Sequence, residues 1–91
     1  MLIALIARDK PGALDIRKAN RESHLAYIDA TGVVNQAGPL LDDAEQMIGS
    51  LVILAVADMA AAQGWADDDP YAKAGLFESV ELIPWKRVIG G

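Results

Sequence analysis

The sequence predicts an α+β fold in which elements in the order β-α-β-β-α-β build a four-stranded antiparallel sheet. Short apolar runs typical of strands alternate with stretches whose apolar residues recur at helical spacing. Glycine, proline and aspartate residues separate these segments, as expected for turns and helix ends. Hydrophobic residues make up 53% of the 91 residues, which is enough for the core of one domain over residues 1–91.

The first half of the chain supplies two strands and the longer helix. Leu2–Ala7 is an apolar run, which predicts a strand that is buried on both faces. Residues 13–30 have helical periodicity, and Gly32 suits the left-handed conformation that often ends a helix. Val33–Ala37 predicts the second strand, which we expect Gly38-Pro39 to terminate.

The chain then forms a loop, a central strand and a helix. Leu40–Gln46 carries several acidic side chains and predicts a loop between two strands. Ile48–Val56 is a nearly continuous run of β-forming residues, which favours a central position in the sheet. Asp58 is a suitable N-cap for a helix over the alanine-rich segment Met59–Ala66.

The last part of the chain predicts a short helix and the fourth strand. Asp69 is a suitable N-cap with Pro70 at the first helical position, and Gly75 closes this helix. Phe77–Pro84 alternates apolar and polar residues, which predicts a half-exposed strand. Trp85–Gly91 is then a tail that could pair with a partner chain.

The predicted order is that of ferredoxin-like folds, in which the two helices cover one face of the sheet. The opposite face is then bare, although the strands contain more Ile, Val and Leu than one buried face needs. An apolar sheet face of this size requires a cover. A second copy packed face to face is the simplest cover, so we expect a homodimer.

Composition and charge exclude several classes of protein. With 8 basic and 13 acidic residues the net charge is −5, which argues against nucleic-acid binding because phosphate neutralisation supplies much of that affinity. No run of about 20 apolar residues exists for a membrane span. The absence of cysteine excludes disulfides, thiol catalysis and cysteine-based zinc sites. We therefore expect a cytoplasmic protein without a metal or cofactor.

His24, the single histidine, lies on a helix stripe that also carries Arg17 and Arg21. Imidazole titrates near neutral pH, so His24 is a candidate acid–base catalyst, and a buried structural histidine is the alternative. The two arginines suit a pocket for a small anionic molecule. Their alternative role is to extend toward the acidic loop and pair with Asp42, Asp43 or Glu45.

Three further residues complete the candidate site. Asp69 is a suitable partner for His24, because a carboxylate beside an imidazole orients it for acid–base catalysis, and the same residue could simply cap a helix. Ser50 could donate a hydrogen bond to a ligand or be an ordinary strand residue. Tyr27 lies about 60° from His24 around the helix, so it could reach the pocket rim or pack at a dimer contact.

An ordered set of short segments resembles the YciI-like (YCII-related) proteins over nearly the whole chain. The specificity of the resemblance lies in the order and spacing of the segments. These segments are Ala7-Arg8-Asp9-Lys10-Pro11, Arg17, Arg21-Glu22-Ser23-His24-Leu25, Gly38-Pro39-Leu40, Gly49-Ser50, Trp65, Asp69-Pro70-Tyr71, Ala74-Gly75-Leu76 and Pro84-Trp85.

The resemblance implies a dimeric α+β barrel, similar to muconolactone isomerases, with a pocket that holds a His–Asp pair. On this sequence the pair corresponds to His24 and Asp69. Relatives include a dehydrochlorinase that acts on a chlorinated hydroxyquinol. We therefore expect a cofactor-free enzyme that transfers a proton or eliminates a group from a small cyclic anion. The residues expected to bind the substrate are Arg17, Arg21, Ser50 and Tyr27.

Two other interpretations of the same residues stay open. The chain could be a non-catalytic dimer that binds a small ligand. It could also be a structural accessory protein in which His24 is buried and hydrogen-bonded.

Overall fold

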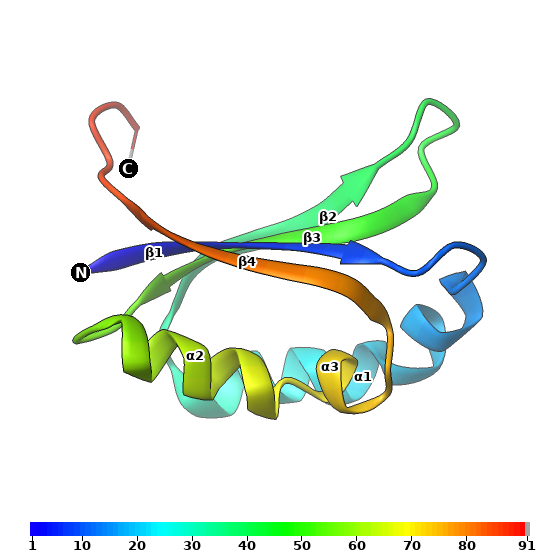
Figure 1. Cartoon of the computed structure of the whole chain (residues 1–91), viewed down its shortest axis with the longest axis horizontal. Helices are drawn as coiled ribbons and strands as arrows, with labels where there is room; N and C mark the ends of the chain where they lie inside the picture. The colour runs from blue at the N-terminus through cyan, green and yellow to red at the C-terminus, as the bar shows by residue number, and fades with distance from the viewer. Residues whose placement is uncertain (91) are drawn as a thin grey trace.

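The computed structural model describes residues 1–90, and Gly91, the end of the expected tail, lies outside the described residues. The elements are β1 (Leu2–Asp9), α1 (Leu14–Thr31), β2 (Val34–Leu41), β3 (Met47–Ala55), α2 (Met59–Asp68), α3 (Pro70–Lys73) and β4 (Phe77–Trp85). The strands form one antiparallel sheet in the order β2-β3-β1-β4, which confirms the predicted α+β architecture. Figure 1 shows the helices together on one side of this sheet.

The helix ends use the residues that the sequence predicts. Gly32 follows α1 in the left-handed conformation, with a φ of 65°. The Asp58 carboxylate accepts a hydrogen bond from the N–H of Ala61 at the start of α2. The Asp69 carboxylate accepts one from the N–H of Tyr71 at the start of α3. These local contacts explain why the element order could be predicted without tertiary information.

β2 is longer than the sequence predicts. It continues through Gly38 and Pro39 to Leu41, so the prediction that these residues end the strand is wrong. β2 lies at the edge of the sheet, and an edge strand tolerates proline because half of its N–H groups face away from the sheet. Pro39 pairs with Ser50 of β3, so both residues lie on the same face of the sheet.

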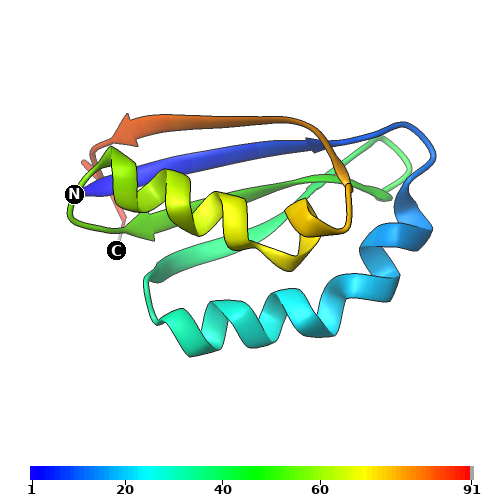
Figure 2. The same cartoon turned by 60° about the horizontal axis from the view of Figure 1, so that its bottom comes forward.

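The hydrophobic core lies between the sheet and α2. Ile3 and Leu5 of β1 and Leu54 of β3 are almost completely buried, and Trp65 of α2 packs against them. The indole N–H of Trp65 donates a hydrogen bond to the side-chain oxygen of Thr31 at 3.0 Å, which ties α2 to the end of α1. Figure 2 shows both helices lying lengthwise along the sheet.

α1 has polar residues at the centre of the stripe that faces the sheet. Its buried residues are Arg17 and His24, whereas Leu25 on the same stripe is 46% exposed. A buried arginine and a buried histidine require polar partners, because burying an unpaired charge or donor is costly. The space between α1 and the sheet is therefore where a polar site can form.

The opposite face of the sheet is apolar and is not covered by any helix within residues 1–90. Leu51, Ile83 and Trp85 point to this face and are between 37% and 41% exposed. A groove of about 590 Å³ runs along it. Within the same residues, no helix combines the length and hydropathy that a membrane crossing requires.

Candidate active site

A cavity of about 200 Å³ lies between α1 and the half of the sheet formed by β2 and β3. Its volume is on the scale of one small ring, since an engineered cavity of about 150 Å³ holds benzene. The apolar residues that line it are Leu25, Ile28, Ala37, Pro39, Met47 and Val52. The lining also contains four residues that the sequence predicts for the site, namely Arg17, Arg21, His24 and Ser50.

His24 and Asp69 form a buried hydrogen-bonded pair at this cavity. His24 Nδ1 lies 2.8 Å from Asp69 Oδ1, and the two side chains are 8% and 2% exposed. α1 supplies the histidine, and the turn between α2 and α3 supplies the aspartate. The same Oδ1 accepts a hydrogen bond from the N–H of Tyr71 at 3.0 Å. Asp69 therefore caps α3 and orients the imidazole at the same time.

The contact with Asp69 determines the tautomer of His24. A carboxylate only accepts hydrogen bonds, so Nδ1 carries the hydrogen and Nε2 keeps its lone pair while the ring is neutral. Nε2 has no hydrogen-bond partner within residues 1–90, and every fully buried side-chain nitrogen or oxygen of these residues has one. Nε2 is therefore accessible, and His24 lines the cavity. The nitrogen that can act as a base is the one that a ligand can reach.

The ring of Tyr71 packs against both Arg17 and His24. It stacks on the imidazole with ring centroids 4.0 Å apart, and Arg17 Cζ lies 4.7 Å from its centroid. Because residues 17 and 24 are about two helical turns apart, the tyrosine ring fits between their side chains. Burial raises the pKa of Tyr71 above its ordinary value, and the charge of Arg17 offsets part of this rise. Tyr71 is therefore neutral at physiological pH.

Arg17 is buried, and Asp9 and Ser50 hold it in addition to Tyr71. Its Nε and Nη2 atoms lie 2.7 Å and 2.8 Å from the two carboxylate oxygens of Asp9, and Nη2 also donates to Ser50 Oγ at 2.9 Å. Burial lowers the pKa of Arg17, but the hydrogen bonds and charges of Asp9 and Tyr71 together outweigh burial and raise that pKa above its ordinary value. The alternative of pairing with the acidic loop does not apply to Arg17, because its partner is Asp9.

Arg21 is the exposed cation of the cavity. It lines the cavity one helical turn before His24. None of the ion pairs within residues 1–90 includes Arg21, so its guanidinium is available to an anionic ligand.

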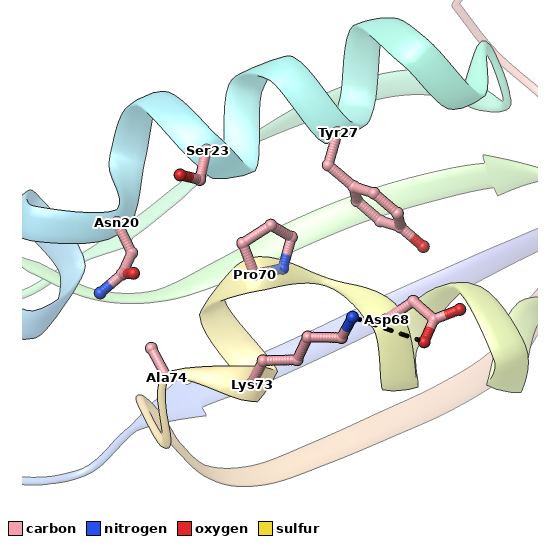
Figure 3. A pocket seen from close by; sticks show the side chains of 7 residues that line it. All are labelled: Asn20, Ser23, Tyr27, Asp68, Pro70, Lys73 and Ala74. Carbon is pink, nitrogen blue, oxygen red and sulfur yellow. Dashed lines mark ion pairs between the residues drawn. The ribbon is translucent and has the colours of Figure 1, made fainter.

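Tyr27 does not line this cavity, contrary to the expectation from helix geometry. Its hydroxyl donates a hydrogen bond to the backbone carbonyl of Trp65 at 2.8 Å, and its ring packs on the Trp65 indole. The rotation of about 60° from His24 directs the side chain toward α2 instead of the sheet. Figure 3 shows this direction.

Tyr27 lines a different, more open hollow of about 700 Å³ between α1 and α3 (Figure 3). The charged residues of this hollow are Asp68 and Lys73, which lie 3.9 Å apart and are more than half exposed. Neither His24 nor Asp69 lines it. The smaller cavity is therefore the candidate active site.

Sequence reasoning assigned no role in the site to Asp9 or Tyr71. Asp9 ends β1 and reaches Arg17 only because α1 folds back beside the sheet. The one available signal was that both residues lie in segments that carry the family resemblance. Within the described residues, no group of three or more His, Asp or Glu side chains gathers as a metal site would require.

The fold places the chain among ferredoxin-like α+β barrel proteins. The chain belongs to the YCII-related domain family, whose model matches residues 1–86. It is 38% identical to protein YciI of Escherichia coli, with 97% of this chain and 99% of that protein covered. It is 36% identical to an uncharacterized protein of Haemophilus influenzae with the same coverage.

Solved structures with the same fold include one enzyme at substantial sequence identity. The 5-chloro-2-hydroxyhydroquinone dehydrochlorinase (TftG) of Burkholderia phenoliruptrix, in complex with 2,5-dihydroxybenzoquinone, is 32% identical. It superposes with a TM-score of 0.86, and 94% of each chain is covered. A NIPSNAP family protein of Agrobacterium tumefaciens, 21% identical with a TM-score of 0.54 over 89% of this chain and 86% of that one, shares the fold alone.

Proposed function

We propose that this protein is a small enzyme that performs acid–base chemistry, a proton transfer or an elimination, on a small cyclic anion. The observation that carries the proposal is the buried His24–Asp69 pair, in which Nε2 of the histidine is accessible and the residue lines a cavity of about 200 Å³. The similarity to a dehydrochlorinase solved with 2,5-dihydroxybenzoquinone supports a single oxygenated ring as the substrate class. A ring of that size matches the volume of the cavity.

In this proposal His24 Nε2 removes a proton from the substrate. The proton returns at another position in an isomerisation, or is released to solvent after a leaving group has departed in an elimination. Asp69 stabilises the imidazolium that forms, because its carboxylate lies 2.8 Å from Nδ1. Arg21 attracts the anion, and Ser50 donates a hydrogen bond to it. Such general acid–base catalysis contributes about 10²–10⁴-fold, and positioning in the cavity supplies the remainder.

We also propose that two copies associate through the bare face of the sheet. The support is chemical: that face exposes Leu51, Ile83 and Trp85 around an apolar groove, and a soluble monomer seldom leaves such a patch uncovered. A second copy presents the same surface, so a two-fold axis lets each face cover the other.

The test of catalysis compares the wild-type protein with His24→Ala. Chlorinated hydroxyquinols and small lactones are incubated with each protein, and products are separated by chromatography. We expect turnover by the wild-type protein and a loss of at least about 10²-fold in the variant. Ser23→Ala, an exposed neighbour outside the cavity, is the matched control and retains activity. Turnover that survives His24→Ala would overturn the mechanism.

The same compounds distinguish catalysis from simple binding. A compound that stabilises the protein against heat is a ligand, because binding to the native state alone raises its stability. If such a ligand is recovered chemically unchanged after long incubation, the protein is a ligand-binding dimer and the enzymatic proposal is wrong.

A further inference from the structure

We propose that Asp9 is a positioning residue that organises Arg17 and Ser50 into a paired-donor site for one oxygen of the ligand. This inference rests on the proposed function, because it requires that the ligand occupies the cavity between α1 and the sheet. Within the buried Arg17–Asp9–Ser50 group, some hydrogen-bond donors are used by the protein and others are left for a ligand.

Asp9 holds the Arg17 guanidinium by one edge. A guanidinium has five N–H donors in one plane. Asp9 accepts from Nε and Nη2, and Ser50 Oγ accepts the second hydrogen of Nη2. Both charged side chains are at most 5% exposed. These contacts use Nε and both hydrogens of Nη2, so Nη1 is the end of the guanidinium that Asp9 and Ser50 do not bind.

Nη1 makes none of the three hydrogen bonds to Asp9 and Ser50, and the guanidinium also interacts with the Tyr71 hydroxyl. Nη1 carries two hydrogens, so Tyr71 leaves at least one of them for a ligand. Arg17 is 3% exposed overall, and it lines the cavity. In this proposal the remaining hydrogen of Nη1 is directed into that cavity.

The hydroxyl hydrogen of Ser50 is available to the same ligand. Ser50 Oγ accepts from Arg17, and none of the hydrogen bonds within residues 1–90 has the Ser50 hydroxyl as its donor. The outer hydrogens of Nη1 and Nη2 are parallel because the guanidinium is planar. The outer hydrogen of Nη2 is donated to Ser50 Oγ, so Ser50 lies beside the outer hydrogen of Nη1. The Nη1–H and Ser50 O–H groups can therefore donate to the same ligand oxygen.

The charge balance indicates which oxygen this pair suits. Asp9 cancels the charge of Arg17 but leaves the N–H and O–H dipoles in place. Preorganised dipoles favour an oxygen whose negative charge grows during the reaction, such as a ring carbonyl that becomes an enolate when a neighbouring proton is removed. A buried ion pair gives little net stability over apolar residues of similar shape, so orientation is the property that Asp9 provides.

The test uses the full-length protein and 2,5-dihydroxybenzoquinone as the probe, with affinity measured by calorimetric titration. Asp9→Asn removes one negative charge near the cavity and places an amide N–H against the guanidinium. If Asp9 acted through its charge alone, the variant would bind this anionic probe more tightly. Because Asp9 positions Arg17 and Ser50, we expect binding at least about tenfold weaker. Asp29→Asn, an exposed site on α1 with the same charge change, leaves the affinity within about twofold.

Ser50→Ala provides the second measurement and leaves the ion pair intact. We expect about a tenfold loss of probe affinity, and a further loss of less than about threefold when Ser50→Ala is added to Asp9→Asn, because both changes remove the same donor. If Asp9→Asn does not fold, Ser50→Ala decides alone. Unchanged affinity in Ser50→Ala, or tighter binding by Asp9→Asn, overturns the inference and leaves the His24–Asp69 proposal standing. A wild-type protein that does not bind the probe contradicts the proposed substrate class and this inference with it.

Discussion

The hydrogen bond between His24 and Asp69 leads to a prediction about a single hydrogen atom. The structure requires Nδ1–H as the neutral tautomer of His24, because a carboxylate oxygen lies 2.8 Å from Nδ1. The perturbation is a pair of substitutions, Asp69→Asn and Asp69→Ala. The first retains an oxygen at the Oδ1 position, which also accepts from the N–H of Tyr71, and the second removes it.

The size of the effect follows from the strength of the bond. A hydrogen bond to a charged group contributes about 1.5–3 kcal/mol, which corresponds to a tautomer preference of about tenfold to a hundredfold. A neutral bond contributes about 0.5–1.5 kcal/mol, so Asp69→Asn weakens the preference to about twofold to tenfold. Asp69→Ala abolishes it. The wild-type protein should therefore contain more than about nine-tenths of the Nδ1–H form.

The assay is nitrogen-15 NMR of the imidazole above neutral pH, where the two ring nitrogens have separate shifts. His24 is the single histidine of the chain, so the spectrum contains one imidazole and needs no assignment. Asp68→Asn is the matched control, because this neighbouring carboxylate is 69% exposed and its ion pair is with Lys73. A wild-type spectrum dominated by Nε2–H, or one that Asp69→Ala leaves unchanged, would refute the reasoning.

Two other predictions concern assembly and stability. Leu51→Lys places a charge at a 40% exposed position on the bare sheet face, so light scattering should find a dimer for the wild-type protein and a monomer for the variant. Ile16→Lys on α1, at a position that is 38% exposed, is the control and should leave the mass of the dimer unchanged. A monomeric wild-type protein contradicts the proposed dimer. Burial raises the pKa of Tyr71, so the unfolded chain loses this proton first and the free energy of unfolding falls above about pH 10. Tyr71→Phe should flatten that fall in urea titrations between about pH 9 and about pH 11, and an equal slope in both proteins would count against the assignment.

Local signals explain the part of the fold that could be predicted from the sequence. Asp58 and Gly32 act on backbone groups within a few residues, and their cap contacts are found at the ends of α2 and α1. The predicted β2 strand was too short, because glycine and proline in sequence usually end a strand, as expected for Gly38-Pro39. Its place at the sheet edge, which makes proline acceptable, depends on the pairing of all four strands.

The candidate site could likewise be predicted only in part from the sequence. Helical spacing put Arg17, Arg21 and His24 on one stripe, and the cavity is lined by all three. The pairing of His24 with Asp69 was an expectation from the chemistry of the two side chains and from family resemblance, since no rule of spacing brings together residues that are 45 positions apart. The angle of Tyr27 on α1 predicted that its side chain lies near the site. Its hydroxyl instead donates a hydrogen bond to the backbone of α2.

The sequence by itself determined the order of the elements, their caps and the types of side chain available for chemistry, because these depend on contacts within about one helical turn or one strand. Only the tertiary structure decided which of those side chains meet. Asp9 binds Arg17, and Asp69 binds His24, because packing of α1 and α3 against the sheet buries all four side chains together. Buried polar groups need partners, and the partner that each one finds is set by the fold as a whole.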